Sequence, residues 1–317
     1  MPLVSERGAD LVAKARAGDT RATARLLSVV ENEEPGAADA LRQLYPETGR
    51  ARVIGVTGPP GGGKSTLVNR LAGAYREQAQ RVAVVAVDPS SPFSGGALLG
   101  DRIRMSERFL DEGLFIRSMA SRGHSGGLAR STSRVVNVLD AIGYGVVLVE
   151  TVGVGQEEVE VIRVVDTVVL VTVPGLGDDI QAIKAGVLEI ADVLVVNKAD
   201  RPGADETARD LAQMLGLGKL RTSWKPPIVR TVAATGENVP QLVDAIEKHR
   251  AWASENGERD RRRRDAARAE VEDLLREALI RRLRVRVGDA SVDRMVARVA
   301  ARTIDPYAAV EKLLKES

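Results

Sequence analysis

The chain has 317 residues, of which 44% are hydrophobic and 28% are charged, and its formal net charge is +2. It has no cysteine and two histidines, which excludes disulfides, thiol catalysis and thiolate metal sites and argues against a His-rich metal site. The near-neutral charge argues against a nucleic-acid partner, and no signal peptide or membrane-length apolar run is present, so we expect a cytoplasmic protein without a membrane partner.

The first 50 residues are predicted to form a helical extension. Apolar residues recur there at helical spacing, and the "GDT" at 18–20 interrupts the pattern. The stripe before the break is Leu11, Val12 and Ala15, and the stripe after it is Leu26, Leu27 and Val30. Turn signals at 32–36 and 45–49 then separate this extension from the next region of the chain.

Residues 51–250 alternate short apolar runs with helical stretches. The runs are Val-rich and apolar throughout, a pattern typical of strands buried on both faces of a mostly parallel sheet. They cover residues 52–56, 81–87, 144–150, 167–173, 192–197 and 227–233. Helices between such strands form βαβ units, so this region predicts a doubly wound α/β domain.

Residues 251–317 are predicted to form a helical C-terminal segment. Val271, Leu274, Leu275 and Ala278 follow helical spacing, and Asp305 with Pro306 predicts a further helix start. The arginine run at 261–264 is interleaved with acidic residues and few aromatics, which favours a solvated or dimer-facing helix over a nucleic-acid surface.

A phosphate-binding loop is predicted after the first strand. The segment "GPPGGGKST" fits the pattern G-x-x-x-x-G-K-[ST] and precedes a helix, so its backbone N–H groups can surround phosphates. Lys64 would reach the β- and γ-phosphates, and the Ser65 hydroxyl would bind Mg²⁺. The predicted nucleotide-binding residues here are Gly58, Pro59, Pro60, Gly61, Gly62, Gly63, Lys64, Ser65 and Thr66.

A second motif, Asn197-Lys198-Ala199-Asp200, ends a later strand and selects the base. The Asp200 carboxylate can accept hydrogen bonds from N1–H and the 2-amino group of guanine, whereas adenine would leave it unmatched. Asn197 can support the loop, and the Lys198 stem can cover the base. The predicted nucleotide is therefore GTP.

A third motif, Glu150-x-x-Gly153, occupies the position of a switch that senses the γ-phosphate. Val154 replaces the glutamine that small GTPases use to orient water, and Gln156 is out of register, so weak intrinsic hydrolysis is expected. The predicted catalytic residues are Lys64, Glu150, Gly153 and Gln156. Asp88 and Asp101 could join the Mg²⁺ shell, although a turn-capping Asp and a surface Asp are the alternatives.

These motifs, with "VDPSSPFSGGALLGDRIRM", "RGHSGGL" and "PGLGDDIQAIKAG", resemble the methylmalonyl-CoA mutase-associated GTPases, the MeaB proteins, formerly labelled lysine/arginine/ornithine transport-system kinases. The resemblance implies a P-loop G domain of the SIMIBI-like class that acts as a GTP-dependent chaperone. Such proteins assist an adenosylcobalamin-dependent methylmalonyl-CoA mutase and form homodimers through their C-terminal helices. A cobalamin adenosyltransferase is a further partner implied.

The resemblance also assigns residues. It places Ser65, Asp88, Asp101 and Glu150 around Mg²⁺. It implies that Asn197, Lys198 and Asp200 read guanine. It also implies that Val232, Ala233 and Ala234 close over the base, with Val232 in place of the usual serine. The segment 175–184 corresponds to a mobile switch that includes Asp178, Gln181 and Lys184, and His124 is expected to be structural.

Two other functions stay open at this stage. A P-loop kinase that phosphorylates a transport or other acceptor protein would need an acceptor pocket with a nearby base. A metallochaperone-type GTPase that inserts nickel would use Cys and His ligands, which argues against it here because the chain has no cysteine.

Overall fold

The computed structural model describes residues 3–88, 111–120, 127–151, 153, 164–175, 188–217 and 222–315. Within these ranges one sheet of seven parallel strands has the order β3-β2-β4-β1-β5-β6-β7. The strands are β1 (Arg52–Thr57), β2 (Val82–Asp88), β3 (Leu114–Ala120), β4 (Val146–Thr151), β5 (Thr167–Thr172), β6 (Val193–Asn197) and β7 (Ile228–Thr231). The predicted doubly wound α/β fold is confirmed, and the sheet is parallel throughout the described strands.

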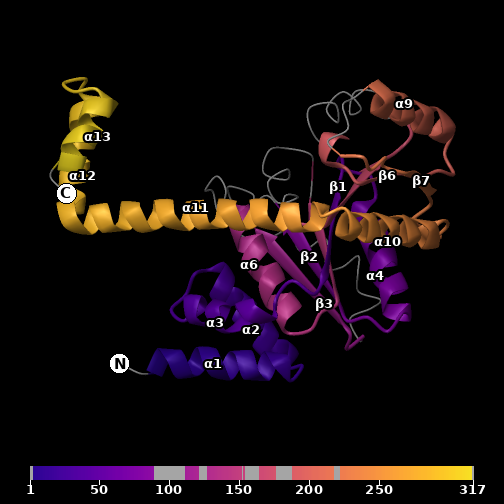
Figure 1. Cartoon of the computed structure of the whole chain (residues 1–317), viewed down its shortest axis with the longest axis horizontal. Helices are drawn as coiled ribbons and strands as arrows, with labels where there is room; N and C mark the ends of the chain where they lie inside the picture. The colour runs from indigo at the N-terminus through magenta and orange to yellow at the C-terminus, as the bar shows by residue number, and fades with distance from the viewer. Residues whose placement is uncertain are drawn as a thin grey trace. The chain divides into compact units, whose positions relative to one another are not determined.

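Helices cover both faces of this sheet (Figure 1). Alternate residues of each strand point to opposite faces. One face packs against α4 (Lys64–Glu77) and α10 (Val239–Glu255). The other packs against α6 (Gly127–Ala141), α9 (Ala204–Leu217) and the N-terminal helices α1 (Leu3–Arg16), α2 (Thr20–Glu31) and α3 (Ala37–Leu44). Short 3-10 turns occupy Tyr45–Glu47 and Leu188–Ile190.

The strand β3 was not predicted from the sequence. It lies at the edge of the sheet, paired only with β2 among the described strands. Phe115 and Met119 are buried, but Arg117 between them pairs with Glu31 of α2. An edge strand covered by polar contacts lacks the continuous apolar run that marks the central strands, which explains the omission.

The chain divides into two compact units, residues 1–262 and 263–317. The first unit contains the sheet and the N-terminal helices, and the division falls within α11 (Glu258–Val287). In the second unit, α12 (Asp289–Ala300) contacts α13 (Pro306–Lys315). Over the described residues, none of the helices is both long enough and apolar enough to cross a membrane.

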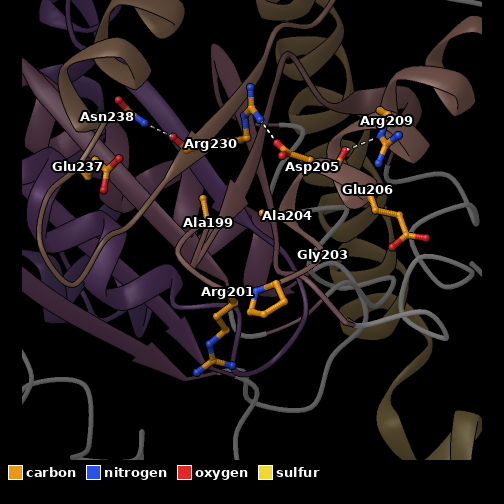
Figure 2. A pocket seen from close by; sticks show the side chains of 11 residues that line it. Ala199, Arg201, Gly203, Ala204, Asp205, Glu206, Arg209, Arg230, Glu237 and Asn238 are labelled. Carbon is orange, nitrogen blue, oxygen red and sulfur yellow. Dashed lines mark hydrogen bonds and ion pairs between the residues drawn. The ribbon is translucent and has the colours of Figure 1, made fainter.

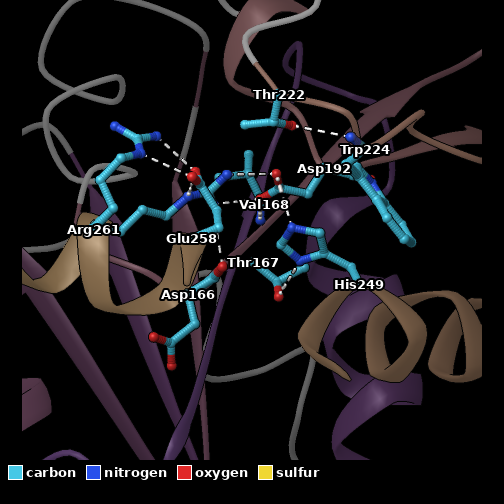
Figure 3. Close-up of polar contacts among 10 residues, drawn as sticks. Asp166, Thr167, Val168, Asp192, Thr222, Trp224, His249, Glu258 and Arg261 are labelled. Atoms are coloured by element: carbon cyan, nitrogen blue, oxygen red, sulfur yellow. Dashed lines mark hydrogen bonds and ion pairs between the residues drawn. The ribbon is translucent and has the colours of Figure 1, made fainter. Parts of the chain in front are cut away.

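A buried carboxylate, Asp192, ties the start of α11 to the amino ends of β5 and β6 (Figure 3). Asp192 accepts hydrogen bonds from the Val168 N–H at 2.8 Å and from both terminal nitrogens of Arg262 at 2.7 Å, and His249 Nε2 lies 3.2 Å away. Burial alone raises the pKa of Asp192, but the contacts with Arg262 and His249 outweigh it, so the pKa lies below its ordinary value. Asp192 is therefore ionised and paired inside the fold.

We expect Arg262→Ala to destabilise the first unit by about 3–5 kcal/mol, because it leaves the Asp192 carboxylate buried without its main partner. Urea unfolding followed by tryptophan fluorescence measures this, since Trp224 and Trp252 both pack on His249. The matched control is Arg276→Ala, which removes an exposed pair with Asp273 and should cost at most about 1 kcal/mol.

The same contact predicts a pH dependence. Because the pKa of Asp192 is lowered by folding, its contribution is fully present above the ordinary value of 3.8 and is lost as pH falls through the lower folded pKa. The loss of stability in acid should therefore be shallower in Arg262→Ala than in the parent chain. Equal decreases in the free energy of unfolding for Arg262→Ala and Arg276→Ala would contradict this account.

Candidate functional site

The predicted phosphate loop lies between β1 and α4, pressed against the carboxyl ends of β5 and β6. Gly58 has φ 145°, and a Cβ there would lie 2.1 Å from the carbonyl oxygen of Val171. Gly63 has φ 84°, and a Cβ there would lie 2.4 Å from Asn197 Nδ2. Both positions require glycine for backbone conformation and for space, so the loop can fold only with these residues.

Lys64, the first residue of α4, folds back over this loop. Its side chain is 6% exposed, and Nζ donates to the carbonyl oxygens of Gly58 at 2.8 Å and Pro59 at 2.9 Å. The ammonium group is thus held beside the loop, at the positive N-terminal end of a helix. This arrangement is suited to binding the oxygens of a phosphate chain.

The Glu150-x-x-Gly153 motif lies directly beside the phosphate loop, because β4 pairs with β1. The Ser65 hydroxyl donates to Glu150 Oε1 at 2.5 Å, and Glu150 is 5% exposed. The carbonyl oxygen of Gly153 accepts from the Thr57 hydroxyl at 2.8 Å and from Thr151 at 3.3 Å. Neither threonine was predicted from the sequence, although each directly follows a predicted strand or site residue.

Asn197 connects the phosphate loop to the loop after β7. Its Nδ2 donates to the Gly62 carbonyl oxygen at 2.8 Å. Its Oδ1 accepts from the Ala233 N–H at 3.0 Å and from the Thr231 hydroxyl at 3.2 Å. The side chain is 2% exposed, so these contacts satisfy a buried amide and fix two loops relative to each other.

The other residues predicted to read the base lie at the same edge of the sheet. Lys198 has φ 55° and donates from Nζ to the Gly61 carbonyl oxygen at 2.8 Å, so its stem lies along the phosphate loop. Asp200 is exposed in the following turn, and Ala234 is exposed in the loop after β7. Val232 is buried, and its N–H donates to the Glu237 carbonyl oxygen at 3.2 Å.

Several predicted site residues cannot be placed in this geometry. The side chain of Asp88, at the end of β2, lies outside the described residues. So do Asp101, Gln156, the switch residues Asp178, Gln181 and Lys184, and the glycine-rich loop of His124. Among the described residues, no group of three or more His, Cys, Asp or Glu side chains could hold a metal ion.

A cavity of about 620 Å³ is lined by residues that follow β6 and by residues of β7 and the loop after it (Figure 2). Ala199 and Arg201 line the cavity. Lys198, which directly follows β6, instead contacts the phosphate loop. Its remaining polar lining mixes both charges, and Arg230 pairs with Asp205 across it. None of these lining residues belongs to the phosphate loop, whereas Ala199 belongs to the motif that is predicted to select the base.

A sequence model of the family described as "Methylmalonyl Co-A mutase-associated GTPase MeaB" matches residues 23–287. The chain belongs to this family. It is 47% identical over 310 residues to a putative GTPase of Pyrococcus abyssi, covering 97% of this chain and 96% of the relative. It is 34% identical over 267 residues to the mitochondrial methylmalonic aciduria type A homolog of Mus musculus, covering 83% of this chain and 64% of that protein.

A crystal structure of a LAO/AO transport system kinase has the same fold over nearly the whole chain, with a TM-score of 0.71 and 25% identity. The match covers 97% of this chain and 96% of that chain. The MeaB-family chain is accordingly a GTPase with a P-loop domain of the SIMIBI type, as the sequence predicted.

In this MeaB-family GTPase we expect Asn197→Asp to weaken GDP binding by roughly 10- to 100-fold. The variant keeps an acceptor for Ala233 and Thr231. It replaces the Nδ2 donor, which lies 2.8 Å from the Gly62 carbonyl oxygen in the parent chain, by a carboxylate oxygen that repels this carbonyl. Isothermal titration with GDP measures the effect.

The matched control is Asn238→Asp, which makes the same chemical change. Asn238 Nδ2 also donates to a carbonyl oxygen, that of Arg230 at 2.9 Å, but this contact is exposed and involves no residue of the phosphate loop. Its GDP affinity should stay within about threefold of the parent. Equal weakening in both variants would mean that Asn197 does not couple the two loops.

Proposed function

We propose that this protein is a GTP-hydrolysing chaperone that assists the assembly and protection of an adenosylcobalamin-dependent acyl-CoA mutase, with methylmalonyl-CoA mutase as the candidate. The family description, which names association with that mutase, supports the partner. The observation that supports GTP dependence is the pair of hydrogen bonds made by Asn197. They join the phosphate loop at Gly62 to the loop after β7 at Ala233, which is proposed to contact the base. Occupancy of one part then affects the other.

Guanine recognition is proposed to rest on Asp200 and Lys198. The exposed Asp200 carboxylate can accept from N1–H and the 2-amino group of guanine, two donors that adenine does not present together. The Lys198 stem, held by the Gly61 carbonyl, can cover one face of the purine. A nucleotide that leaves Asp200 unmatched loses a charge-assisted contact.

Mg²⁺ is proposed to bind at the Ser65–Glu150 pair. A hydroxyl and a carboxylate oxygen 2.5 Å apart at the end of the phosphate loop are the hard oxygen ligands that this ion prefers, together with nucleotide oxygens and water. When bound, the ion supplies positive charge at the β- and γ-phosphate oxygens. Lys64 supplies a second positive charge there, and Asp88 and Asp101 stay proposed ligands.

Hydrolysis is proposed to depend on the partner. Thr57 and Thr151 donate to the Gly153 carbonyl oxygen, and this support is consistent with a Gly153 N–H that meets the γ-phosphate. The apolar Val154 cannot orient water by a hydrogen bond, and Gln156 or a group from the mutase is proposed to do so. We propose Asp178, Gln181 and Lys184 as switch residues that relay the nucleotide state to the mutase.

The kinase alternative shares the phosphate loop but differs in the acceptor. A kinase needs a bound acceptor with a base beside it, whereas a guanine-reading motif joined to a switch-like Glu-x-x-Gly favours transfer to water. The name of the structurally similar LAO/AO transport system kinase keeps this alternative testable. The nickel-inserting alternative has no support from the cysteine-free sequence.

The deciding measurement is phosphate release from GTP by the full chain, alone and with an adenosylcobalamin-dependent methylmalonyl-CoA mutase, with ATP as the control nucleotide. We expect slow release from GTP alone and at least about tenfold faster release with the mutase, because a supplied water-positioning group is worth that much. Fast release that the mutase leaves unchanged would contradict the chaperone. Labelled phosphate on a protein would instead establish the kinase.

We also propose that residues 251–317 form a dimerisation segment beside a GTPase domain at 51–250 and an N-terminal extension at 1–50, in a cytoplasmic homodimer. The described second unit exposes large apolar side chains along α11, α12 and α13. Large apolar side chains that gather on an exposed surface favour an interaction site. The exposed residues there are Val271, Leu274, Leu275, Leu279, Ile280, Val285, Val296, Tyr307, Val310 and Leu314. A cobalamin adenosyltransferase is proposed as a further partner.

Replacing Leu275 and Leu279 together by Glu should convert a dimer into a monomer. Each leucine is 56% exposed in the single chain, and the variant removes the apolar surface that pairing would bury. Light scattering after gel filtration measures the mass. The control is Arg282→Glu on the same helix, which adds negative charge without removing apolar surface. A double variant that keeps the parent mass would rule out this face as the dimer contact.

A further inference from the structure

Arg70, on α4 two turns after Lys64, reaches from the phosphate-binding helix to the loop that follows β7. Its Nε donates to the Ala233 carbonyl oxygen at 3.0 Å, and a terminal nitrogen donates to the Ala234 carbonyl oxygen. Its stem runs beside Gly236, where an added Cβ would lie 3.9 Å from Arg70 Cδ. No sequence motif predicted this residue.

The N–H groups of that loop can be assigned one by one. The Val232 N–H donates to Glu237, and the Ala233 N–H donates to Asn197. No described residue accepts from the N–H of Ala234, which is exposed. Ala234 therefore carries the first N–H of the loop that a bound base can use.

The direction of that N–H depends on Arg70. The Ala233 carbonyl and the Ala234 N–H belong to one planar peptide unit, and the structure has no cis peptide among the described residues. In a trans peptide the C=O and N–H bonds point in opposite directions. Fixing the carbonyl toward Arg70 on one side therefore aims the N–H toward the other side.

We propose that Arg70 is a specificity-determining positioning residue that aims the Ala234 N–H at O6 of guanine. This inference rests on the proposed reading of guanine by Asp200 and adds a second contact at O6, which neighbours N1–H on the same edge of the base. O6 accepts a hydrogen bond, whereas the 6-amino group of adenine presents a donor to the same N–H. Arg70 does not touch the base and acts through the peptide that it holds.

The test compares three nucleotides on the full chain by competition against fluorescent GDP. Guanosine and inosine diphosphates both carry O6, whereas the diphosphate of 2-aminopurine riboside lacks it. We expect Arg70→Ala to weaken binding of the first two by the same factor, roughly 3- to 10-fold, and to leave binding of the third unchanged. Arg70→Lys, which keeps one donor group, should restore part of the loss.

The matched control is Arg209→Ala, since Arg209 donates only to the Asp205 carbonyl of its own helix among the described residues. It should change none of the three affinities. Equal weakening of all three nucleotides by Arg70→Ala, or no change in any, would overturn the inference. If the parent chain bound guanosine diphosphate no tighter than the 2-aminopurine nucleotide, the proposed guanine reading itself would fail.

Discussion

A buried carboxamide has to satisfy its donor and its acceptor together, and at Asn197 this requirement sets the positions of two loops. The donor can meet the Gly62 carbonyl only because Gly63 has no Cβ to fill the space beside Asn197 Nδ2. The acceptor takes the Ala233 N–H and so holds the loop after β7. Leaving any of these buried groups unmatched costs more than forming the bond gains, so the loops are constrained as one.

The parallel sheet explains why its central strands carry polar groups only at their ends. Its central strands are buried on both faces, so their inner positions are apolar, and the polar residues lie at the strand ends and in the loops. The carboxyl ends bring Glu150, Asn197 and the phosphate loop together. The amino ends carry Asp192 with Arg262, which stabilises the fold and contacts no predicted nucleotide residue. The predicted binding site and this anchor thus lie at opposite ends of the same parallel strands.

Local sequence patterns were enough to predict most of the fold and the site. The features that were not predicted depend on contacts between residues far apart in the sequence. The six Val-rich strands, the phosphate loop and the Asn197 motif each lie within one short segment. The edge strand β3 was missed because Arg117 interrupts it to contact α2. The Asn197–Gly62 bond joins residues 135 apart, and the Arg70–Ala233 bond joins residues 163 apart. Such pairs follow from strand order, which periodicity does not determine.

The second unit raises a different physical question, namely what stabilises a helix such as α11 beyond Arg262. Most helical stability in proteins comes from packing an apolar face, and isolated helices are marginal in water. A unit as short as residues 263–317 can bury little apolar surface by itself, and Leu275 and Leu279 are both more than half exposed in the single chain. Their exposure is unfavourable unless another apolar surface covers them. A second copy of the same helix presents the same leucines, and its pairing would bury both sets at once.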